Sequence, residues 1–133
     1  MKIFIDTNVL ISATLFPSGV AAKAYRKAVA FPNQGIISDY SVSELSEVFH
    51  RKFSNRIPEL NNFLVTALTT LRLVSTPEEE EVSVPNLRDK KDLPVLRSAI
   101  AAEADILLTG DKDFTEAGIT HPVVMTPSDF LNL

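Results

Sequence analysis

The sequence lacks cysteine and tryptophan altogether, and only two histidines and four glycines occur among its 133 residues. Without cysteine the chain forms neither disulfides nor thiolate metal sites, and two histidines leave little imidazole for zinc or copper. No uninterrupted apolar run exceeds four residues, whereas a helix needs about 20 to span a bilayer. The apolar start at residues 1–5 meets an acid at Asp6, so we expect no signal peptide, no membrane partner and a cytoplasmic location.

The remaining composition is typical of a folded domain. Hydrophobic residues make up 45% of the chain and charged residues 23%, which is enough to build a core and argues against intrinsic disorder. The length predicts a single domain over residues 1–133. Acidic residues outnumber basic ones by 17 to 13, for a formal net charge of −4. This acidic balance speaks at first sight against a nucleic-acid partner, which usually leaves a basic footprint.

Short apolar segments alternate with helical patterns along the chain. We predict strands at residues 2–5, 35–37, 72–74, 106–108 and 123–125, and a further short strand at 82–84 within a charged loop over 75–91. Residues 9–11 suit a helix, and further helices are predicted to begin at Ser18, Ser41, Pro58, Asp92 and Thr126, where capping residues or prolines precede apolar residues at helical spacing. Short apolar strands separated by helices predict a three-layer α/β/α fold with a central parallel sheet.

Acidic residues recur where a site would lie in such a fold. Asp6 follows the first strand directly, Asp111 and Asp113 follow the strand at 106–108, and Glu44 and Asp92 stand near helix starts. Strand carboxyl ends and helix N-termini share one edge of a parallel sheet, and ligands bind there where the strand order reverses. Clustered carboxylates repel one another unless protons or cations compensate, and Mg²⁺ or Mn²⁺ prefers such oxygen ligands.

Each of these acids also has an ordinary structural explanation. Carboxylates at helix N-termini cap free N–H groups, which would account for Asp92 or Glu44 taken singly, and Asp113 could cap a turn over 114–117. Asp89 could be solvated or paired with a neighbouring cation, and the glutamates at 78–81 are expected to form a solvated loop. Only the joint placement of the five acids predicts a site.

Four segments of the sequence resemble the motifs of PIN domains. Ile3–Ile11 (IFIDTNVLI) resembles the strand that opens these domains, and Ser43–Leu45 resembles the segment that carries their helical glutamate. Arg88–Leu96 and Ala104–Phe114 resemble their two C-terminal acidic motifs. The most similar group comprises small bacterial and archaeal PIN proteins related to VapC-type toxins of toxin–antitoxin pairs. The resemblance covers essentially the whole chain and implies the Rossmann-like topology of that family.

The resemblance implies a metal-dependent ribonuclease that leaves 5′-phosphate and 3′-hydroxyl ends. The implied catalytic residues and metal ligands are Asp6, Glu44, Asp92 and Asp111, with Asp113 as a further ligand and Asn8, Thr109 and Asp89 as accessory residues. In the third motif Lys90 and Lys91 separate Asp89 from Asp92, so either acid could be the ligand. We favour Asp92 because it opens a helix. One or two Mg²⁺ or Mn²⁺ ions would be bound.

The implied partners are an RNA substrate, an antitoxin protein and a second copy of the chain in a homodimer. The best placed cations for RNA adjoin the acidic motifs: Arg88, Lys90, Lys91 and Lys112. Two alternatives remain open, a PIN nuclease of RNA processing outside any toxin–antitoxin pair and a non-catalytic RNA- or protein-binding module. A phosphatase of the haloacid dehalogenase type is disfavoured, because the second aspartate that it needs is replaced by Asn8.

Overall fold

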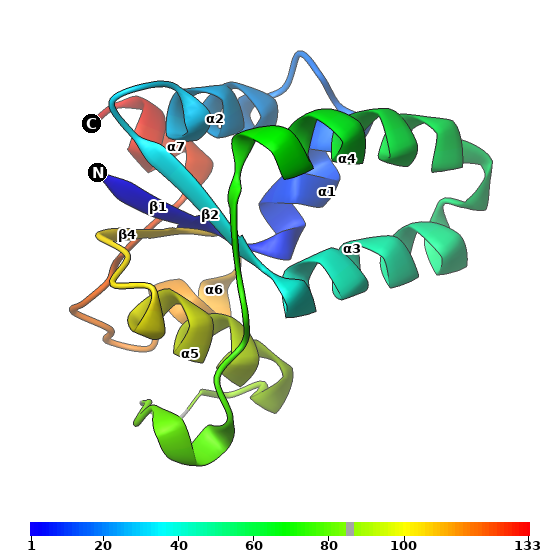
Figure 1. Cartoon of the computed structure of the whole chain (residues 1–133). Helices are drawn as coiled ribbons and strands as arrows, with labels where there is room; N and C mark the ends of the chain where they lie inside the picture. The colour runs from blue at the N-terminus through cyan, green and yellow to red at the C-terminus, as the bar shows by residue number, and fades with distance from the viewer. Residues whose placement is uncertain (85–86) are drawn as a thin grey trace.

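The computed structural model describes residues 1–84 and 87–133 and contains a five-stranded sheet in which each neighbouring pair of strands is parallel (Figure 1). The strands are β1 (Lys2–Ile5), β2 (Gln34–Ser38), β3 (Arg72–Val74), β4 (Ile106–Leu108) and β5 (Val123–Met125), in the order β3-β2-β1-β4-β5. The predicted α/β fold and its five main strands are confirmed, and four of these strands match the predicted bounds to the residue, whereas β2 extends one residue further at each end.

Helices connect the strands. The α-helices are α1 (Thr7–Leu15), α2 (Val20–Val29), α3 (Asp39–Lys52), α4 (Ile57–Thr70), α5 (Leu93–Ala101), α6 (Lys112–Thr115) and α7 (Pro127–Leu131). Short 3₁₀ turns are η1 (Ser54–Arg56), η2 (Glu79–Glu81) and η3 (Lys90–Asp92). Among the described residues, no helix is both long and apolar enough to cross a membrane.

Both faces of the sheet are buried, because alternate side chains of each central strand point to opposite layers. Ile3 and Ile5 of β1 join a core with residues of α1, α2, α3, α4 and α7, whereas Phe4 between them joins a core with residues of α5 and α6. Ile106 and Leu108 of β4 divide from Leu107 in the same way. Figure 1 shows these helices on the two sides of the sheet.

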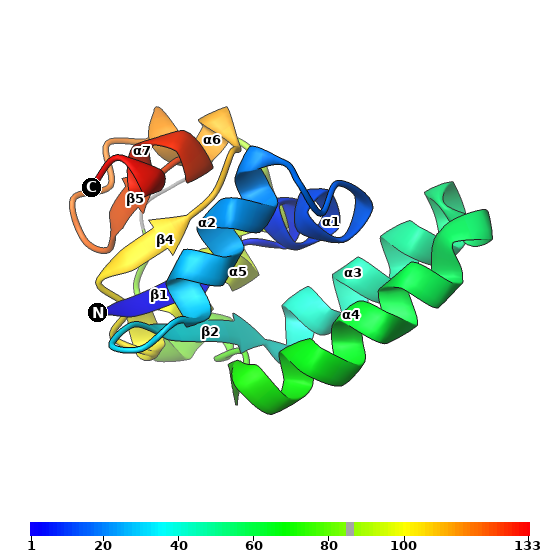
Figure 2. The same ribbon diagram turned by 90° about the horizontal axis from the view of Figure 1, so that it is seen from above.

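Helices α3 and α4 lie side by side and project beyond the sheet (Figure 2). Leu45 and Phe49 of α3 and Leu60 and Ala67 of α4 are buried in the core that also contains α1. The ring of Phe63 lies 5.2 Å from that of Tyr25 and links α4 to α2. The first turns of α3 therefore border the carboxyl edge of the sheet, while its later turns extend away from it.

The predicted strand at Val82–Val84 is wrong. The chain instead forms η2 at Glu79–Glu81, where Glu78 and Glu81 make a reciprocal capping box. Short apolar segments become strands only where a neighbouring strand offers hydrogen bonds, and none of the described strands pairs with this one. Residues 85 and 86 of the predicted loop lie outside the described residues.

Two predicted helix starts are corrected, and one residue at a predicted start makes no capping hydrogen bond. The N-cap of α3 is Ser38, whose Oγ accepts a hydrogen bond from the Ser41 amide at 3.1 Å, so Ser41 lies inside the helix. Gly19 rather than Ser18 precedes α2. Asp92 occupies the N-cap position of α5, but its backbone is helical and its side chain makes no capping hydrogen bond, since η3 leads straight into α5. The predicted cap at Thr126 is confirmed.

Candidate active site

The strand order reverses between β1 and β4, and this is where the first acidic residue lies. The chain places β2 and β3 on one side of β1 and then β4 and β5 on the other. Ile5 of β1 is level with Leu108 of β4, and the Asp6 amide donates to the Leu108 carbonyl at 3.0 Å. The ends of these strands bring Asp6 next to Thr109, at the switch point where parallel α/β sheets bind ligands.

Asp6 is a buried carboxylate held by two hydrogen bonds. Only 6% of its surface is exposed. Its Oδ1 accepts from the Thr7 amide at 2.8 Å, which caps α1, and its Oδ2 accepts from the Thr109 hydroxyl at 2.8 Å. Burial raises the pKa of Asp6 to about 6, the two hydrogen bonds counteract part of this effect, and the charges of Glu44 and Asp111 add to the rise.

Thr109 connects Asp6 to the next acidic turn. Its buried hydroxyl donates to Asp6 and accepts from the Asp111 amide at 3.0 Å. The carboxylate of Asp111 in turn caps α6 by accepting from the Asp113 amide at 2.9 Å. The Gly110 amide donates to Oδ1 of Asn8 at 3.4 Å. The hydrogen bonds of Thr109 and Asn8 therefore hold this turn in place. Asp113 was a candidate to cap a turn over 114–117, but the N-cap of α6 is Asp111.

Asp92 carries a second perturbed carboxylate. Its partly buried side chain has its pKa raised to about 7, first by desolvation and then by the charges of Asp111, Asp6, Asp89 and Asp113. Two buried polar side-chain atoms have no hydrogen-bond partner within residues 1–84 and 87–133, Oδ2 of Asp92 and Oγ1 of Thr7. Buried polar atoms are nearly always hydrogen-bonded, so these two atoms are exceptional among the described residues.

Four of the predicted acids line one small hollow. This carboxylate hollow has a volume of about 180 Å³, and its walls include Asp6, Glu44, Asp92 and Asp111 together with Thr7 and Asn8. Glu44 comes from α3, the other acids from the ends of β1 and β4 and the start of α5. Both residues with an unpartnered buried oxygen, Thr7 and Asp92, contribute to its walls.

A second set of acids overlaps the first at one residue. Carboxylate oxygens of Asp89, Asp92 and Asp113 lie within 4.8 Å of one another, a spacing that suits a shared cation. Asp89 is exposed and caps η3 by accepting from the Lys91 amide at 2.9 Å. Asp92 alone belongs both to this set and to the carboxylate hollow. Its position supports Asp92 over Asp89 as the ligand in the hollow. Asp113 does not line the hollow, but its carboxylate lies within 4.8 Å of that of Asp92.

The donor set fits a hard divalent cation. Each candidate ligand is a carboxylate oxygen, the type of donor that Mg²⁺ and Mn²⁺ prefer. Two of the carboxyl groups have raised pKa values because the charges are crowded and partly buried. A cation would offset this repulsion and would supply the missing partner of Asp92 Oδ2.

The predicted RNA-contacting cations lie outside the carboxylate hollow. Their side chains are exposed: Arg88, Lys90, Lys91 and Lys112. Among them Lys91 lines a larger neighbouring hollow, together with Tyr40 and Arg51, which the sequence had not indicated. Tyr40 stands two residues beyond the end of β2, so the rule that pointed to Asp6 could have found it. Arg51 carried no comparable signal, because it lies more than three turns into α3.

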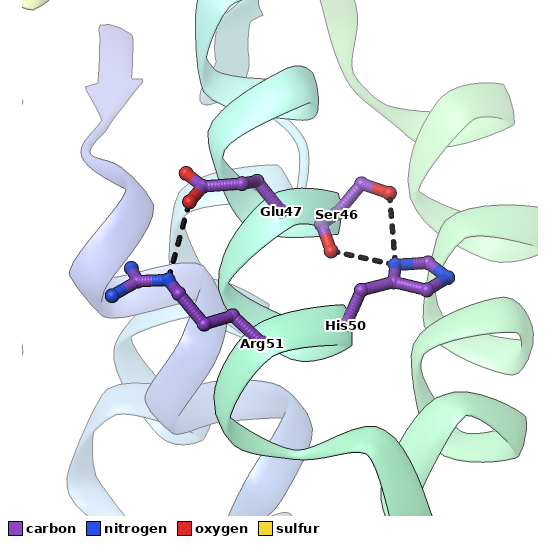
Figure 3. Close-up of polar contacts among 4 residues, drawn as sticks. All are labelled: Ser46, Glu47, His50 and Arg51. Carbon is purple, nitrogen blue, oxygen red and sulfur yellow. Dashed lines mark hydrogen bonds and ion pairs between the residues drawn. The ribbon is translucent and has the colours of Figure 1, made fainter.

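The two histidines lie outside the carboxylate hollow. Nδ1 of His50 donates to the Ser46 carbonyl at 2.8 Å within α3, on the side opposite the pair of Glu47 and Arg51 (Figure 3). His121 is exposed in the turn before β5.

Comparison with known proteins identifies the family. Residues 2–113 match the PIN domain family, so the chain belongs to it, as the sequence motifs indicated. It is 27% identical to the uncharacterized protein MJ1680 from Methanocaldococcus jannaschii, over 98% of this chain and 90% of that protein.

Solved structures share the fold at lower identity. VapBC2 from Rickettsia felis, bound to a DNA fragment from its promoter, is 18% identical with a TM-score of 0.67, over 95% of this chain and 98% of that one. VapBC-1 from nontypeable Haemophilus influenzae is 15% identical with a TM-score of 0.61, over 96% and 99%. VapC20 from Mycobacterium tuberculosis, a toxin that cleaves the sarcin–ricin loop, is 14% identical with a TM-score of 0.59, over 89% and 96%. These likenesses establish the fold.

Proposed function

We propose that this PIN protein is a Mg²⁺- or Mn²⁺-dependent ribonuclease and the toxin component of a type II toxin–antitoxin pair. One observation carries the nuclease assignment: Thr7 and Asp92, the two residues with an unpartnered buried oxygen among the described residues, both line the hollow where four carboxylates meet. Crowded carboxylates and unpartnered polar atoms are unfavourable in a packed protein interior, whereas they are suitable ligands for a hydrated cation. Membership of the PIN family and the RNA-cleaving activity named for the similar VapC20 support the same function.

The proposed ligands are Asp6, Glu44, Asp92 and Asp111, with Asp113 at the outer side. A bound divalent ion supplies Lewis-acid chemistry, since it activates water and stabilises charge on phosphate oxygens. Thr109 keeps the Asp6 carboxylate fixed through its hydroxyl, and the caps of α1 and α6 fix Asp6 and Asp111 on rigid helix ends. The small volume of the carboxylate hollow, about 180 Å³, suits a phosphate group and cations rather than a whole nucleotide.

The direct test is cleavage of RNA by the purified protein with and without Mn²⁺. We expect cleavage that EDTA abolishes, and Asp6→Asn and Asp111→Asn should each reduce the rate to background while the far-UV circular dichroism stays unchanged. Asp129→Asn is the matched control, because Asp129 is exposed on α7 and does not line the carboxylate hollow. Full activity of Asp6→Asn, or RNA binding that neither needs metal nor leads to cleavage, would instead indicate a binding module.

The toxin assignment adds an antitoxin partner and a homodimer. It is supported by the shared fold with VapBC2 and VapBC-1, whose names join a toxin to its antitoxin. Expression of the chain alone should arrest growth, Asp6→Asn should relieve the arrest, and co-expression of a small neighbouring gene should do the same. Cleavage in vitro without growth arrest would favour RNA processing outside a toxin–antitoxin pair.

A further inference from the structure

A larger hollow adjoins the carboxylate hollow. This side hollow has a volume of about 590 Å³, and its walls include Tyr40, Glu44, Glu47, Val48, Arg51 and Lys91. The two hollows share Glu44 and Val48, so they meet along one turn of α3. The side hollow falls within the range of about 300–1,000 Å³ that is usual for ligand sites, whereas the carboxylate hollow is below it. A group attached to a phosphate in the carboxylate hollow therefore has an adjoining recess, the side hollow.

One face of α3 joins the two hollows. Glu44, Glu47, Val48 and Arg51 are spaced three, four and seven residues apart, which places them in line along a helix. Arg51 lies about 10.5 Å beyond Glu44, at 1.5 Å per residue. Figure 3 shows Glu47 and Arg51 leaving the helix together, with Nε of Arg51 3.2 Å from Oε1 of Glu47. The side chains of this pair are 57% and 65% exposed. Exposed ion pairs are weak, so Arg51 can exchange Glu47 for a phosphate.

Tyr40 forms a rigid aromatic wall of the side hollow. Its ring packs against the core that contains Phe4 and Leu96, and its hydroxyl donates to the Lys91 carbonyl at 3.2 Å. The ring is therefore held at both ends, by packing and by a hydrogen bond. An aromatic side chain fixed beside a phosphate site is the usual platform on which proteins stack an unpaired base.

The two hollows differ in charge. The walls of the carboxylate hollow contain four acids and no lysine or arginine among the described residues. The walls of the side hollow contain two acids, Glu44 and Glu47, and two cations, Arg51 and Lys91. A phosphodiester chain that extends from a metal in the carboxylate hollow into the side hollow thus meets two cations there.

We propose that the side hollow binds the nucleotide next to the cleaved bond of a single-stranded RNA, with its base stacked on Tyr40 and its phosphate contacted by Arg51 and Lys91. The proposal rests on the proposed ribonuclease function and assigns the substrate's path across it. Tyr40 and Arg51 are then substrate-binding residues. Glu47 competes with the RNA phosphate for Arg51 and forms the ion pair with it when RNA is absent.

The stacking half of the proposal is tested with RNA that lacks a single base. The kcat/KM of wild type, Tyr40→Leu and Tyr40→Phe is measured with Mn²⁺ on one cleavable oligonucleotide and on versions with an abasic ribose at each position around the cleaved bond. Tyr40→Leu, which keeps apolar packing, should lower kcat/KM on intact RNA by about 5- to 100-fold, mainly through KM. Tyr40→Phe should retain most activity. One abasic RNA should show a similar loss with wild type and no further loss with Tyr40→Leu.

The phosphate half is tested by the salt dependence of binding. Anisotropy of a labelled oligouridylate is measured with Ca²⁺ at several salt concentrations for Arg51→Gln and for Lys52→Gln. Lys52 is exposed on the same helix but does not line the side hollow, so it is a control of equal charge change. Arg51→Gln should reduce the slope of log affinity against log salt by about 0.7, as expected for one lost phosphate contact to a single strand. Lys52→Gln should leave the slope unchanged.

The outcomes distinguish a failure of the proposed subsite from a failure of the proposed ribonuclease function. Equal losses of Tyr40→Leu on intact and on all abasic RNAs, or a loss in Tyr40→Phe as large as in Tyr40→Leu, would overturn the stacking role. Identical slopes for Arg51→Gln and Lys52→Gln would overturn the phosphate contact. In these cases wild type still cleaves RNA and only the subsite fails. Wild type that neither binds nor cleaves RNA with metal would overturn the ribonuclease function, and the subsite with it.

Discussion

Asp92→Asn should stabilise the metal-free protein. The side chain of Asp92 makes no hydrogen bond within the described residues that asparagine would lose, and its Oδ2 is buried without a partner. The substitution keeps the shape of the side chain and removes a charge that lies among the carboxylates of Asp6, Asp89, Asp111 and Asp113. The gain comes from removing repulsion and desolvation, so it should be largest when the carboxylate is ionised.

The size of the gain follows from the pKa of Asp92, which is raised from 3.8 to about 7. At 1.36 kcal/mol per unit this would amount to about 4 kcal/mol for a fully buried group. Asp92 is only partly buried, so screening by water reduces the figure to about 2 kcal/mol. For a chain of this length, a change of that size raises Tm by about 6–8 °C.

The sign of the pH dependence follows from the same shift. Well below pH 4 Asp92 is protonated in both the folded and the unfolded chain, and its charge then has no effect on stability. As the pH rises from about 4 to 7 the unfolded chain gives up its proton first, so stability falls; above pH 7 the full penalty applies. The stabilising effect of Asp92→Asn should therefore be complete at pH 8 and smaller at pH 5.

The assay is urea unfolding in EDTA at pH 5 and pH 8 for wild type, Asp92→Asn and the exposed control Asp129→Asn. Saturating Mn²⁺ should then stabilise wild type at pH 8, by about 2.7 kcal/mol at 100 times Kd, and should stabilise Asp92→Asn far less. If Asp92→Asn unfolds at lower urea than wild type at pH 8 without metal, the charge of Asp92 does not destabilise the fold. If Mn²⁺ stabilises both proteins equally, Asp92 is not a metal ligand.

Three further substitutions test the surroundings of the site by urea unfolding. Thr109→Val should cost about 1–3 kcal/mol, because the Asp6 carboxylate loses a buried donor, whereas Thr109→Ser should cost less; equal losses would contradict this role. Gly35→Ala should cost about 1–3 kcal/mol, because a Cβ there would lie 2.5 Å from Cδ2 of Leu71, and Gly110→Ala, with open space around it, serves as its control. Ser38→Ala should cost about 1 kcal/mol as the lost cap of α3, and an unchanged midpoint would contradict that.

Strands such as β4 were predictable because an apolar run and polar flanking residues coincide in them. Ile106–Leu108 is short, fully apolar and flanked by polar residues, and it is buried on both faces in the sheet. The segment at Val82–Val84 is also short and contains two valines, but it has no strand beside it. Pairing is a property of the fold as a whole, and residues 82–84 carry no local sign of its absence.

The helix starts were harder to predict because capping depends on where the preceding strand ends. Ser38 and Ser41 are both serines before an apolar stripe, and their hydroxyls lie 3.1 Å apart. Since β2 continues through Ser38, the helix begins directly after it and Ser41 becomes an interior residue. A strand one residue longer than expected thus moves the cap by three positions.

The parts of the candidate site that follow from the strand order alone were predictable. Asp6 and Asp111 follow strands that prove to be neighbours, so the rule of carboxyl ends suffices to bring them together. Tyr40 and Arg51 belong to a wall made by one face of α3, and which face turns toward the sheet depends on how Leu45 and Phe49 pack. The packing of the core, and not the site, therefore determines which face of α3 lines the side hollow.

The net charge of −4 conflicts less with an RNA substrate once the positions of the charged residues in the structure are considered. Five of the acids are the proposed metal ligands, and counting them as neutralised by bound cations changes the formal charge from −4 to +1. Four more are consecutive glutamates at 78–81, in and beside η2. Cations line the side hollow, and a hard cation between the carboxylates reverses the sign of the centre, so that it attracts a phosphate instead of repelling it. Affinity for RNA should therefore depend on the metal itself and not on the overall charge of the chain.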